Sequence, residues 1–272
     1  MPRATSVVFN HLIFLGFFLS FCLVGCVSLP NLVSVTKPEG LEVKAAFKEM
    51  VRRQKECRCG VDARASVTLK NLVFAGTIDG YLQAMAPSSL KFVGVNPFGQ
   101  PLLALTTDGE NFRYLDFTET KSIEGSVASD LFQKYLPSGF AADFGFYWII
   151  GRLPPGLVKI LSVARDKTED GYWLELERGK DLFNSMVFFN PDLGVLKRHL
   201  LRNEKGDILL DIQYDNYQSD SVCPLPGEVI LLSGNHSGSL HIKLADWDKT
   251  GVFSAADFVV EIPPGFKQVR IK

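Results

Sequence analysis

Cys26 is the residue whose neighbours most clearly predict chemistry. Its thiol is a nucleophile once deprotonated, and it follows Leu23, Val24 and Gly25. The residue just before it, Gly25, is small. Cys26 is therefore a candidate for covalent modification.

The residues before Cys26 have the composition of an export signal. Arg3 is their only charged side chain, and an apolar run extends from Leu12 to Leu23. Residues 23–26 resemble the lipobox of bacterial lipoproteins, which implies a signal peptide over residues 1–25 and a lipid on Cys26. The alternative is a retained membrane anchor, because residues 4–36 carry no charge and are long enough to span a bilayer.

Three further cysteines could form a disulfide or a metal site. Cys57 or Cys59 can pair with Cys223 in an oxidising compartment, which leaves one odd thiol, or all three stay free. The alternative is a Cys-x-Cys redox or metal site. Zinc normally takes four ligands, and no second closely spaced Cys or His pair follows, so we expect no metal.

The sequence lacks the common catalytic motifs. His11, His199, His236 and His241 do not have metalloprotease spacing. The serine between Gly234 and Gly238 stands one place late for a nucleophile elbow. Acidic pairs such as Asp211 and Asp215 leave catalysis open, but we expect neither an enzyme nor a cofactor.

Composition argues against nucleic acid as a partner and shows an excess of aromatic side chains. The formal net charge is −1, and no basic run exceeds a pair such as Arg52-Arg53. Nucleic-acid binding needs clustered cations, so we expect none. Hydrophobic residues make up 46% of the chain and include 21 Phe, which is more aromatic surface than an exported protein usually carries.

The mature chain is expected to begin with a tether and a helix. Residues 26–40 contain Ser, Asn and Pro and predict a flexible lipidated tether. Apolar residues at helical spacing then predict a helix from Leu41 to about Lys55. We expect residues 41–272 to form a single domain.

Alternation of apolar and polar residues then predicts a large antiparallel sheet. The period of two is clearest over residues 61–70, and Asp108-Gly109 predicts a hairpin turn. About ten or eleven strands follow from such patterns, the last near residues 258–262, and a sheet of that size must curl. Between Val127 and Gly156 one or two short apolar helices are expected. The predicted fold is mainly β with α, an incomplete antiparallel β-barrel whose concave face is covered by helices.

This order of elements resembles the LolA/LolB family of periplasmic lipoprotein carriers and outer-membrane receptors. The segment Val95-Asn96-Pro97-Phe98-Gly99-Gln100 is similar to the Asn-Pro-Leu-Gly loop of LolB, and Phe146 to Pro154 is similar to a Trp-containing helix that leads into Gly-x-Pro. The resemblance covers about residues 41–265. It implies a half-barrel whose hydrophobic cavity, lidded by helices, receives acyl chains.

Two sets of residues are candidates for that cavity, although for any one of them taken alone ordinary core packing is the favoured explanation. The lining candidates are Val67, Leu69, Leu82, Phe92, Leu103, Leu105, Phe112, Tyr114, Leu174, Phe188 and Leu210. The lid candidates are Phe132, Phe146, Trp148 and Ile149.

The loop Asn96, Pro97, Phe98 and Gly99 is a candidate for membrane insertion. Pro97 and Gly99 suit a tight turn that would present Phe98 at its tip. The matching LolB loop has an exposed leucine linked to membrane insertion, whereas this chain has Phe98. The alternative is a turn whose Phe98 folds back onto the core.

Together, the lipobox and the family resemblance imply a lipid-anchored protein that takes acyl chains of lipoproteins or lipids and inserts them into the outer membrane. We expect it to be a monomer. A periplasmic LolA-like carrier would be its donor. The residue after Cys26 is Val27 and not the Asp that resembles an inner-membrane retention signal in enteric bacteria, so we expect the outer membrane. Two alternatives remain: an envelope assembly or scaffolding protein that binds no lipid, and a carrier of another lipid or glycolipid.

Overall fold

The computed structural model describes residues 30–57, 60–71, 75–137, 139–177, 184–218, 223–234, 238–248 and 252–271. Residues 31–272 form one compact unit. The predicted signal peptide, Cys26 and Cys59 lie outside the described residues.

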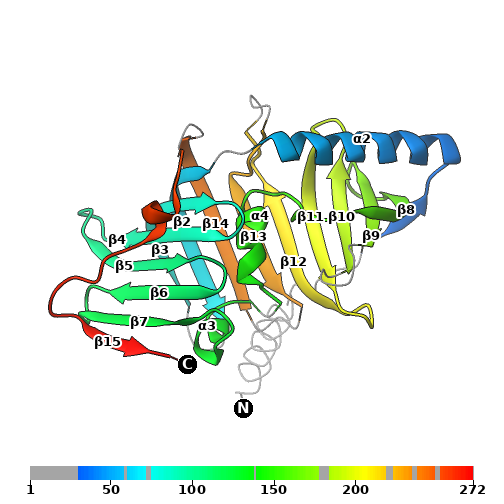
Figure 1. The fold of residues 1–272 in the computed structure, drawn as a ribbon. Helices are drawn as coiled ribbons and strands as arrows, with labels where there is room; N and C mark the ends of the chain where they lie inside the picture. The colour runs from blue at the N-terminus through cyan, green and yellow to red at the C-terminus, as the bar shows by residue number, and fades with distance from the viewer. Residues whose placement is uncertain are drawn as a thin grey trace, which may run out of the picture. The chain divides into compact units, whose positions relative to one another are not determined.

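The fold is one curled, unclosed sheet with few helices (Figure 1). Among the described residues it has 15 strands in the order β1-β8-β9-β10-β11-β12-β13-β14-β2-β3-β4-β5-β6-β7-β15. Every pair of neighbouring strands in this order is antiparallel except β7 and β15, which are parallel. The strands are β1 (Leu32–Ser34), β2 (Val61–Asn71), β3 (Ala75–Met85), β4 (Ser89–Val95), β5 (Pro101–Thr107), β6 (Asn111–Asp116), β7 (Lys121–Ser126), β8 (Lys159–Asp166), β9 (Tyr172–Glu177), β10 (Asn184–Asn190), β11 (Val195–Arg202), β12 (Ile208–Asp215), β13 (Glu228–Ser233), β14 (Gly238–Asp248) and β15 (Lys267–Arg270).

The mainly β, antiparallel and curled architecture predicted from the sequence is confirmed, but the expected ten or eleven strands were too few. In β8 a register shift between Ile160 and Ser162 breaks the period of two that would reveal a strand. β7 has one large apolar residue, so its sequence shows no alternation of apolar and polar residues. β15 is only four residues long, and it pairs with β7, which lies far from it in the sequence. The strand expected near residues 258–262 is replaced by a short 3₁₀ helix and extended chain.

The N-terminal helix α2 (Lys37–Glu56) begins four residues before the predicted start. Thr36 accepts a hydrogen bond from the Glu39 backbone N–H, and Pro38 occupies the first turn, where its missing N–H costs nothing. The predicted tether over residues 26–40 is therefore too long, because β1 also pairs with β8. Val43, Phe47 and Met50 form the buried side of α2.

The other helical elements are short. They are α3 (Asp130–Lys134), η1 (Ala142–Phe144), α4 (Gly145–Ile149) and η2 (Ala255–Phe258). The first three agree with the short apolar helices predicted between residues 127 and 156. No helix within the described ranges is both long and apolar enough to cross a membrane.

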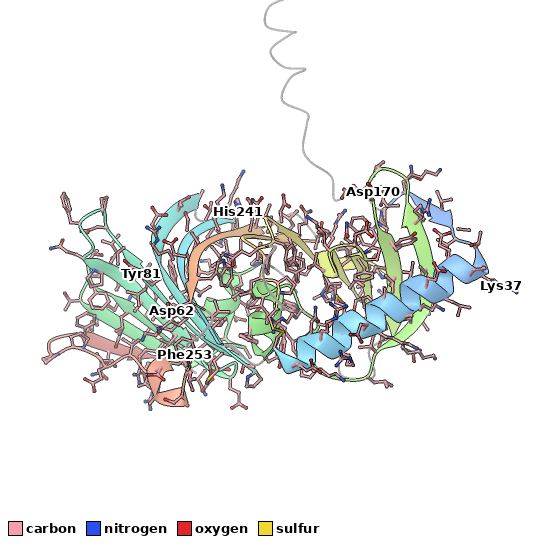
Figure 2. The ribbon with its side chains drawn as sticks, turned by 90° about the horizontal axis from the view of Figure 1, so that it is seen from above. Lys37, Asp62, Tyr81, Asp170, His241 and Phe253 are labelled. Carbon is pink, nitrogen blue, oxygen red and sulfur yellow. A yellow bond between two sulfur atoms is a disulfide. The ribbon has the colours of Figure 1, made fainter. Side chains whose placement is uncertain are left out.

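The two faces of the sheet are covered by different parts of the chain. We call inner the face that carries Leu82, Phe92 and Leu105, which pack into one large cluster together with α2 and α4. Figure 1 shows α2 crossing the strands around β10 and β11, and Figure 2 shows it running along one side of the curled sheet. Phe47 of α2 contacts Phe189 of β10 edge to face, with ring centroids 5.4 Å apart.

A C-terminal segment, residues 252–266, lies on the opposite, outer face of β4 to β6. The Lys91 ammonium donates to the Asp257 carbonyl at 2.9 Å, and the Arg113 guanidinium donates to the Val260 carbonyl at 2.5 Å. Both side chains point away from the inner face because they alternate with Phe92 and Phe112 along their strands. The segment then continues into β15 at the edge of the sheet.

Candidate functional site

Strand register brings most of the predicted lining residues onto the inner face. Leu82, Phe92, Leu105 and Tyr114 stand opposite one another across β3 to β6. The others on this face follow from the same period of two and the same ladders; they are Val67, Leu69, Leu103, Phe112, Leu174 and Leu210.

Phe188 is the exception and corrects one prediction. It pairs with Trp173 and stacks on it with centroids 5.2 Å apart, on the outer face with Leu200. Its neighbours Val187 and Phe189 both belong to the inner cluster. Because β10 is apolar on both faces, alternation within this strand does not say which residues face inward.

The inner-face residues differ in how much of their surface they bury. Leu174 and Leu210 are 0% exposed, and Leu82 and Phe112 are also buried. Side chains of the protein itself therefore fill the space at these positions. The half-buried members are Val67, Leu69, Phe92, Leu103, Leu105 and Tyr114.

The predicted lid residues pack into the core rather than standing free of it. Phe132 lies against Phe112 with centroids 4.8 Å apart, and Trp148 contacts Phe140 at 5.3 Å. Phe146 and Ile149 are buried beside them. In this conformation the segment acts as a wall of the inner cluster.

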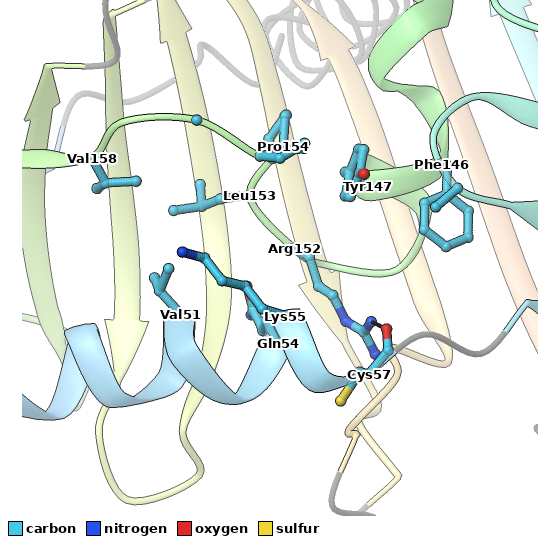
Figure 3. A pocket seen from close by; sticks show the side chains of 13 residues that line it. Val51, Gln54, Lys55, Cys57, Phe146, Tyr147, Arg152, Leu153, Pro154 and Val158 are labelled. Atoms are coloured by element: carbon cyan, nitrogen blue, oxygen red, sulfur yellow. Dashed lines mark hydrogen bonds between the residues drawn. The ribbon is translucent and has the colours of Figure 1, made fainter.

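A pocket of about 420 Å³ lies beside this wall, between the C-terminal end of α2 and residues 146–158 (Figure 3). Its size falls within the range of small-molecule sites, about 300–1,000 Å³. Pro155, Gly156 and Lys55 are exposed, so the pocket reaches the surface. The lining residues are Val51, Gln54, Lys55, Cys57, Ala86, Phe146, Tyr147, Arg152, Leu153, Pro154, Pro155, Gly156 and Val158.

Arg152 is the charged group buried deepest in the pocket wall, with 6% of its surface exposed. Gly151, at a φ of +66°, follows α4 and turns the chain, so that the Arg152 backbone N–H donates to the Tyr147 carbonyl at 2.9 Å. The guanidinium donates to the Cys57 carbonyl at 2.9 Å. Burial raises the pKa of the nearby Tyr147 hydroxyl, which stays a neutral hydrogen-bonding group.

A disulfide fixes the same end of α2. Cys57 and Cys223 are bonded, with Cα atoms 5.8 Å apart, and link the end of the helix to the connection between β12 and β13. This is one of the two pairings left open by the sequence, and it makes the pocket wall part of a closed covalent loop.

The loop Asn96–Gly99 supports itself through its own hydrogen bonds. The Asn96 Oδ1 accepts from the backbone N–H groups of Phe98 and Gln100 at 2.9 and 3.0 Å. Gly99 adopts a φ of +79°, which favours glycine. The Phe98 side chain is 89% exposed, so it does not fold back onto the core.

The pocket could not be predicted from the sequence, because its walls come from the end of α2, from Ala86 and from residues 146–158, which lie far apart in the chain. Of the predicted cavity and lid residues, Phe146 is the one that lines it. One signal was present: Arg152 is the single charge between Phe144 and Val158. A lone cation inside an apolar segment is a candidate for a functional role.

Comparison with known proteins finds similarity in structure and none in sequence. No protein-family model and no curated protein matches the chain. A domain described as an outer membrane lipoprotein-sorting protein from Vibrio parahaemolyticus superposes with a TM-score of 0.56 and 13% identity, covering 82% of this chain and 97% of that one. A LolA superfamily protein from Nitrosomonas europaea gives 0.53 and 11%, covering 79% and 97%.

A DUF1329 family protein from Desulfovibrio piger gives a TM-score of 0.53 and 11% identity, covering 80% of this chain and 97% of that one. At such low identity the likeness concerns the backbone. The order of elements that suggested the family from sequence is thus matched in three dimensions, and the protein has the LolA/LolB-like fold.

Proposed function

We propose that this protein holds acyl chains of lipoproteins or lipids against the inner face of its sheet and inserts them into the outer membrane. Lipid on Cys26 would anchor it to the periplasmic side of that membrane, as a monomer, and a LolA-like carrier would be the donor. It would act as a carrier and receptor, not as an enzyme.

Two observations carry the proposal, an inner sheet face that is only half-buried at several apolar residues and a pocket under α2 lined mostly by apolar residues. Acyl chains gain about 25 cal/mol for each Å² of apolar surface removed from water. Such gains need a concave apolar surface that the protein does not already fill with its own side chains. The pocket under α2 and the half-buried inner-face residues Leu69, Leu103 and Leu105 meet that requirement.

The Phe98 loop supports the insertion step. Exposing a large aromatic ring to water is unfavourable, and a ring held outward by its own turn is suited to a lipid surface. Leu103 lies opposite Gly94, close to this loop in the chain. It is a half-buried apolar residue of the inner face. β5 itself carries no charged residue, although β6 places Asp116 opposite Leu103.

The test is Phe98→Glu in the full-length protein reconstituted in vesicles. A glutamate at the tip should abolish delivery of a fluorescent acyl lipid from donor vesicles, because a carboxylate is costly to bring into the membrane. Leu193→Glu is the matched control, since Leu193 is also an exposed apolar turn residue, at 57%, in the β10–β11 turn.

The proposal predicts loss of delivery for Phe98→Glu and normal delivery for Leu193→Glu, with equal unfolding midpoints for both variants. Unchanged delivery by Phe98→Glu would overturn the insertion step. If neither the unaltered protein nor the two variants deliver the fluorescent lipid, the assembly or scaffolding alternative is favoured.

A further inference from the structure

The helix α2 carries its charges in two separate rows. Four lysines, one arginine and one leucine recur at spacings of three and four residues, which places them on one side of an α-helix. Three glutamates recur at spacings of seven residues and fall on a different side. The first row is Lys37, Leu41, Lys44, Lys48, Arg52 and Lys55, and the second is Glu42, Glu49 and Glu56.

Three of the four glutamates of α2 are paired with arginines. Glu49 accepts two hydrogen bonds from Arg52, each at 2.8 Å, and Arg52 also pairs with Glu56. Glu39 pairs with Arg165 of β8. Within the part of the chain that the structure describes, no ion pair involves the four lysines of the first row. We call Lys37, Lys44, Lys48 and Lys55 the lysine row; Lys44 is half-buried and the others are exposed.

Two exposed leucines accompany the lysine row. Leu41 lies on the same side of α2 and is 69% exposed. Leu157 is 74% exposed, and its neighbours Gly156 and Val158 line the pocket together with Lys55. Lysines and exposed apolar residues on one side of a helix are typical of helices that lie on an acidic membrane. In such helices the lysines meet headgroups and the leucines enter the apolar boundary.

The lipid proposed for Cys26 would hold the start of α2 close to a membrane. Cys26 stands four residues before Pro30, the first residue that the structure describes, and four residues span at most about 14 Å. The strand β1 follows and leads through Thr36 into α2. Figure 2 shows Lys37 at the end of the helix.

We infer that the lysine row, with Leu41 and Leu157, is a docking surface for the acidic headgroups of a membrane. Acidic phospholipids supply the negative charge that the carboxylates of α2 give to arginines instead. An acidic protein would match the charge equally well, but the short connection to Cys26 and the two exposed leucines favour a membrane. The inference goes beyond the delivery of acyl chains, although it uses the lipid proposed for Cys26. That lipid holds the protein at the membrane, and the lysine row sets which side of the protein faces it.

The experiment is chemical footprinting of lysines in the full-length protein bound to vesicles. The vesicles contain phosphatidylcholine alone or an equal mixture of phosphatidylcholine and phosphatidylglycerol, and flotation measures binding to each. Acetylation of every lysine is then followed by mass spectrometry. The lysine row should react about fivefold more slowly on the acidic vesicles, whereas the exposed Lys205 and Lys267 should react equally on both. Salt at about 1 M should remove most of the protection, because the Debye length is then about 3 Å.

The test variant is Lys44→Glu, Lys48→Glu, which reverses the charge at the centre of the lysine row. Its matched control is Lys205→Glu, Lys267→Glu, which makes the same change in charge at two exposed positions outside α2. The two remaining lysines of the row should lose their protection in the test variant and keep it in the control. Equal unfolding midpoints would show that both variants fold.

Equal reaction of the lysine row on neutral and acidic vesicles that both bind the protein would overturn the inference. It would favour an acidic protein as the partner of the row and leave the proposed delivery of acyl chains intact. Protection that survives in Lys44→Glu, Lys48→Glu would also overturn the inference. Protein that floats with neither kind of vesicle would contradict both the inference and the lipid on Cys26.

Discussion

The two halves of the sheet are covered on opposite faces. In the closed half, β8 to β14, α2 lies over the inner face, and residues such as Leu174, Val187 and Ile212 are completely buried. In the open half, β2 to β7, the C-terminal segment lies over the outer face, and much of the inner row stays half-buried.

The difference in burial between the two halves suggests that the closed half contributes more to stability and the open half more to binding. Buried inner residues of the closed half contribute to folding through tight packing, because each is surrounded by protein atoms. Half-buried inner residues of the open half contribute less to folding and keep apolar surface accessible. The C-terminal segment covers the outer face of the open half, while α3 and α4 cover part of its inner face and leave residues such as Leu103 and Leu105 half-buried.

The largest expected effect comes from truncating one inner leucine in each half. Leu210→Ala should lower the free energy of unfolding by about 4 kcal/mol, because the cavity it leaves cannot collapse. Leu103→Ala, in the open half, should lower it by about 1 kcal/mol, because a half-buried side chain loses fewer contacts. Urea unfolding measures the free energy of unfolding of both variants. Similar losses would show that inner-face residues of the two halves contribute equally to stability.

Breaking the disulfide should make the closed half more like the open half. The Cys57→Ser, Cys223→Ser double variant should lose about 3 kcal/mol of stability, because the bond closes a long loop. The end of α2 should also exchange its amide hydrogens faster than the start of the helix. Unchanged exchange at residues 50–56 would mean that packing alone holds α2 on the sheet.

A smaller effect is expected from an ion pair on the outer face of the closed half. A hydrogen bond from Arg202, at 2.7 Å, holds the pKa of Glu175 below its usual value. Stability from this pair is therefore present above the ordinary pKa of glutamate, about 4.3, and is lost as the pH falls through the lowered pKa. The pair is partly exposed, so its contribution is small.

Glu175→Gln isolates this contribution. Near neutral pH the unaltered protein should be slightly more stable than Glu175→Gln, and the gap should shrink toward pH 3. A gap that stays constant with pH would show that the carboxylate's charge is not responsible.

Local patterns predicted the elements whose periodicity is uninterrupted. β2 alternates over its whole length and was recognised from sequence, and the apolar stripe of α2 was visible although its first turn was not. Pro38 and Gly40 suggested a tether, but with the Thr36 cap they start a helix. In β8 the bulge hid a strand that pairing with β9 and β1 stabilises.

Properties that depend on distant segments could not be predicted in this way. Which face Phe188 occupies is set by pairing across β9 and β11, and the pocket exists only where α2 meets residues 146–158. The exposed Phe98 was foreseen as one of two outcomes because its turn is local in sequence. The choice of Cys57 over Cys59 likewise required the end of α2 to be placed beside Cys223.

The central claim is that acyl chains bind to the inner face of the open half and in the pocket under α2. Its most direct test is a peptide map of the full-length protein crosslinked in vesicles to a neutral diazirine-labelled acyl chain. We expect labelling of β5 and β6 around Leu103 to Tyr114 and of residues 146–158, with none on the outer-face pair Trp173 and Phe188. Labelling confined to the outer face, or spread evenly over both faces, would contradict the claim.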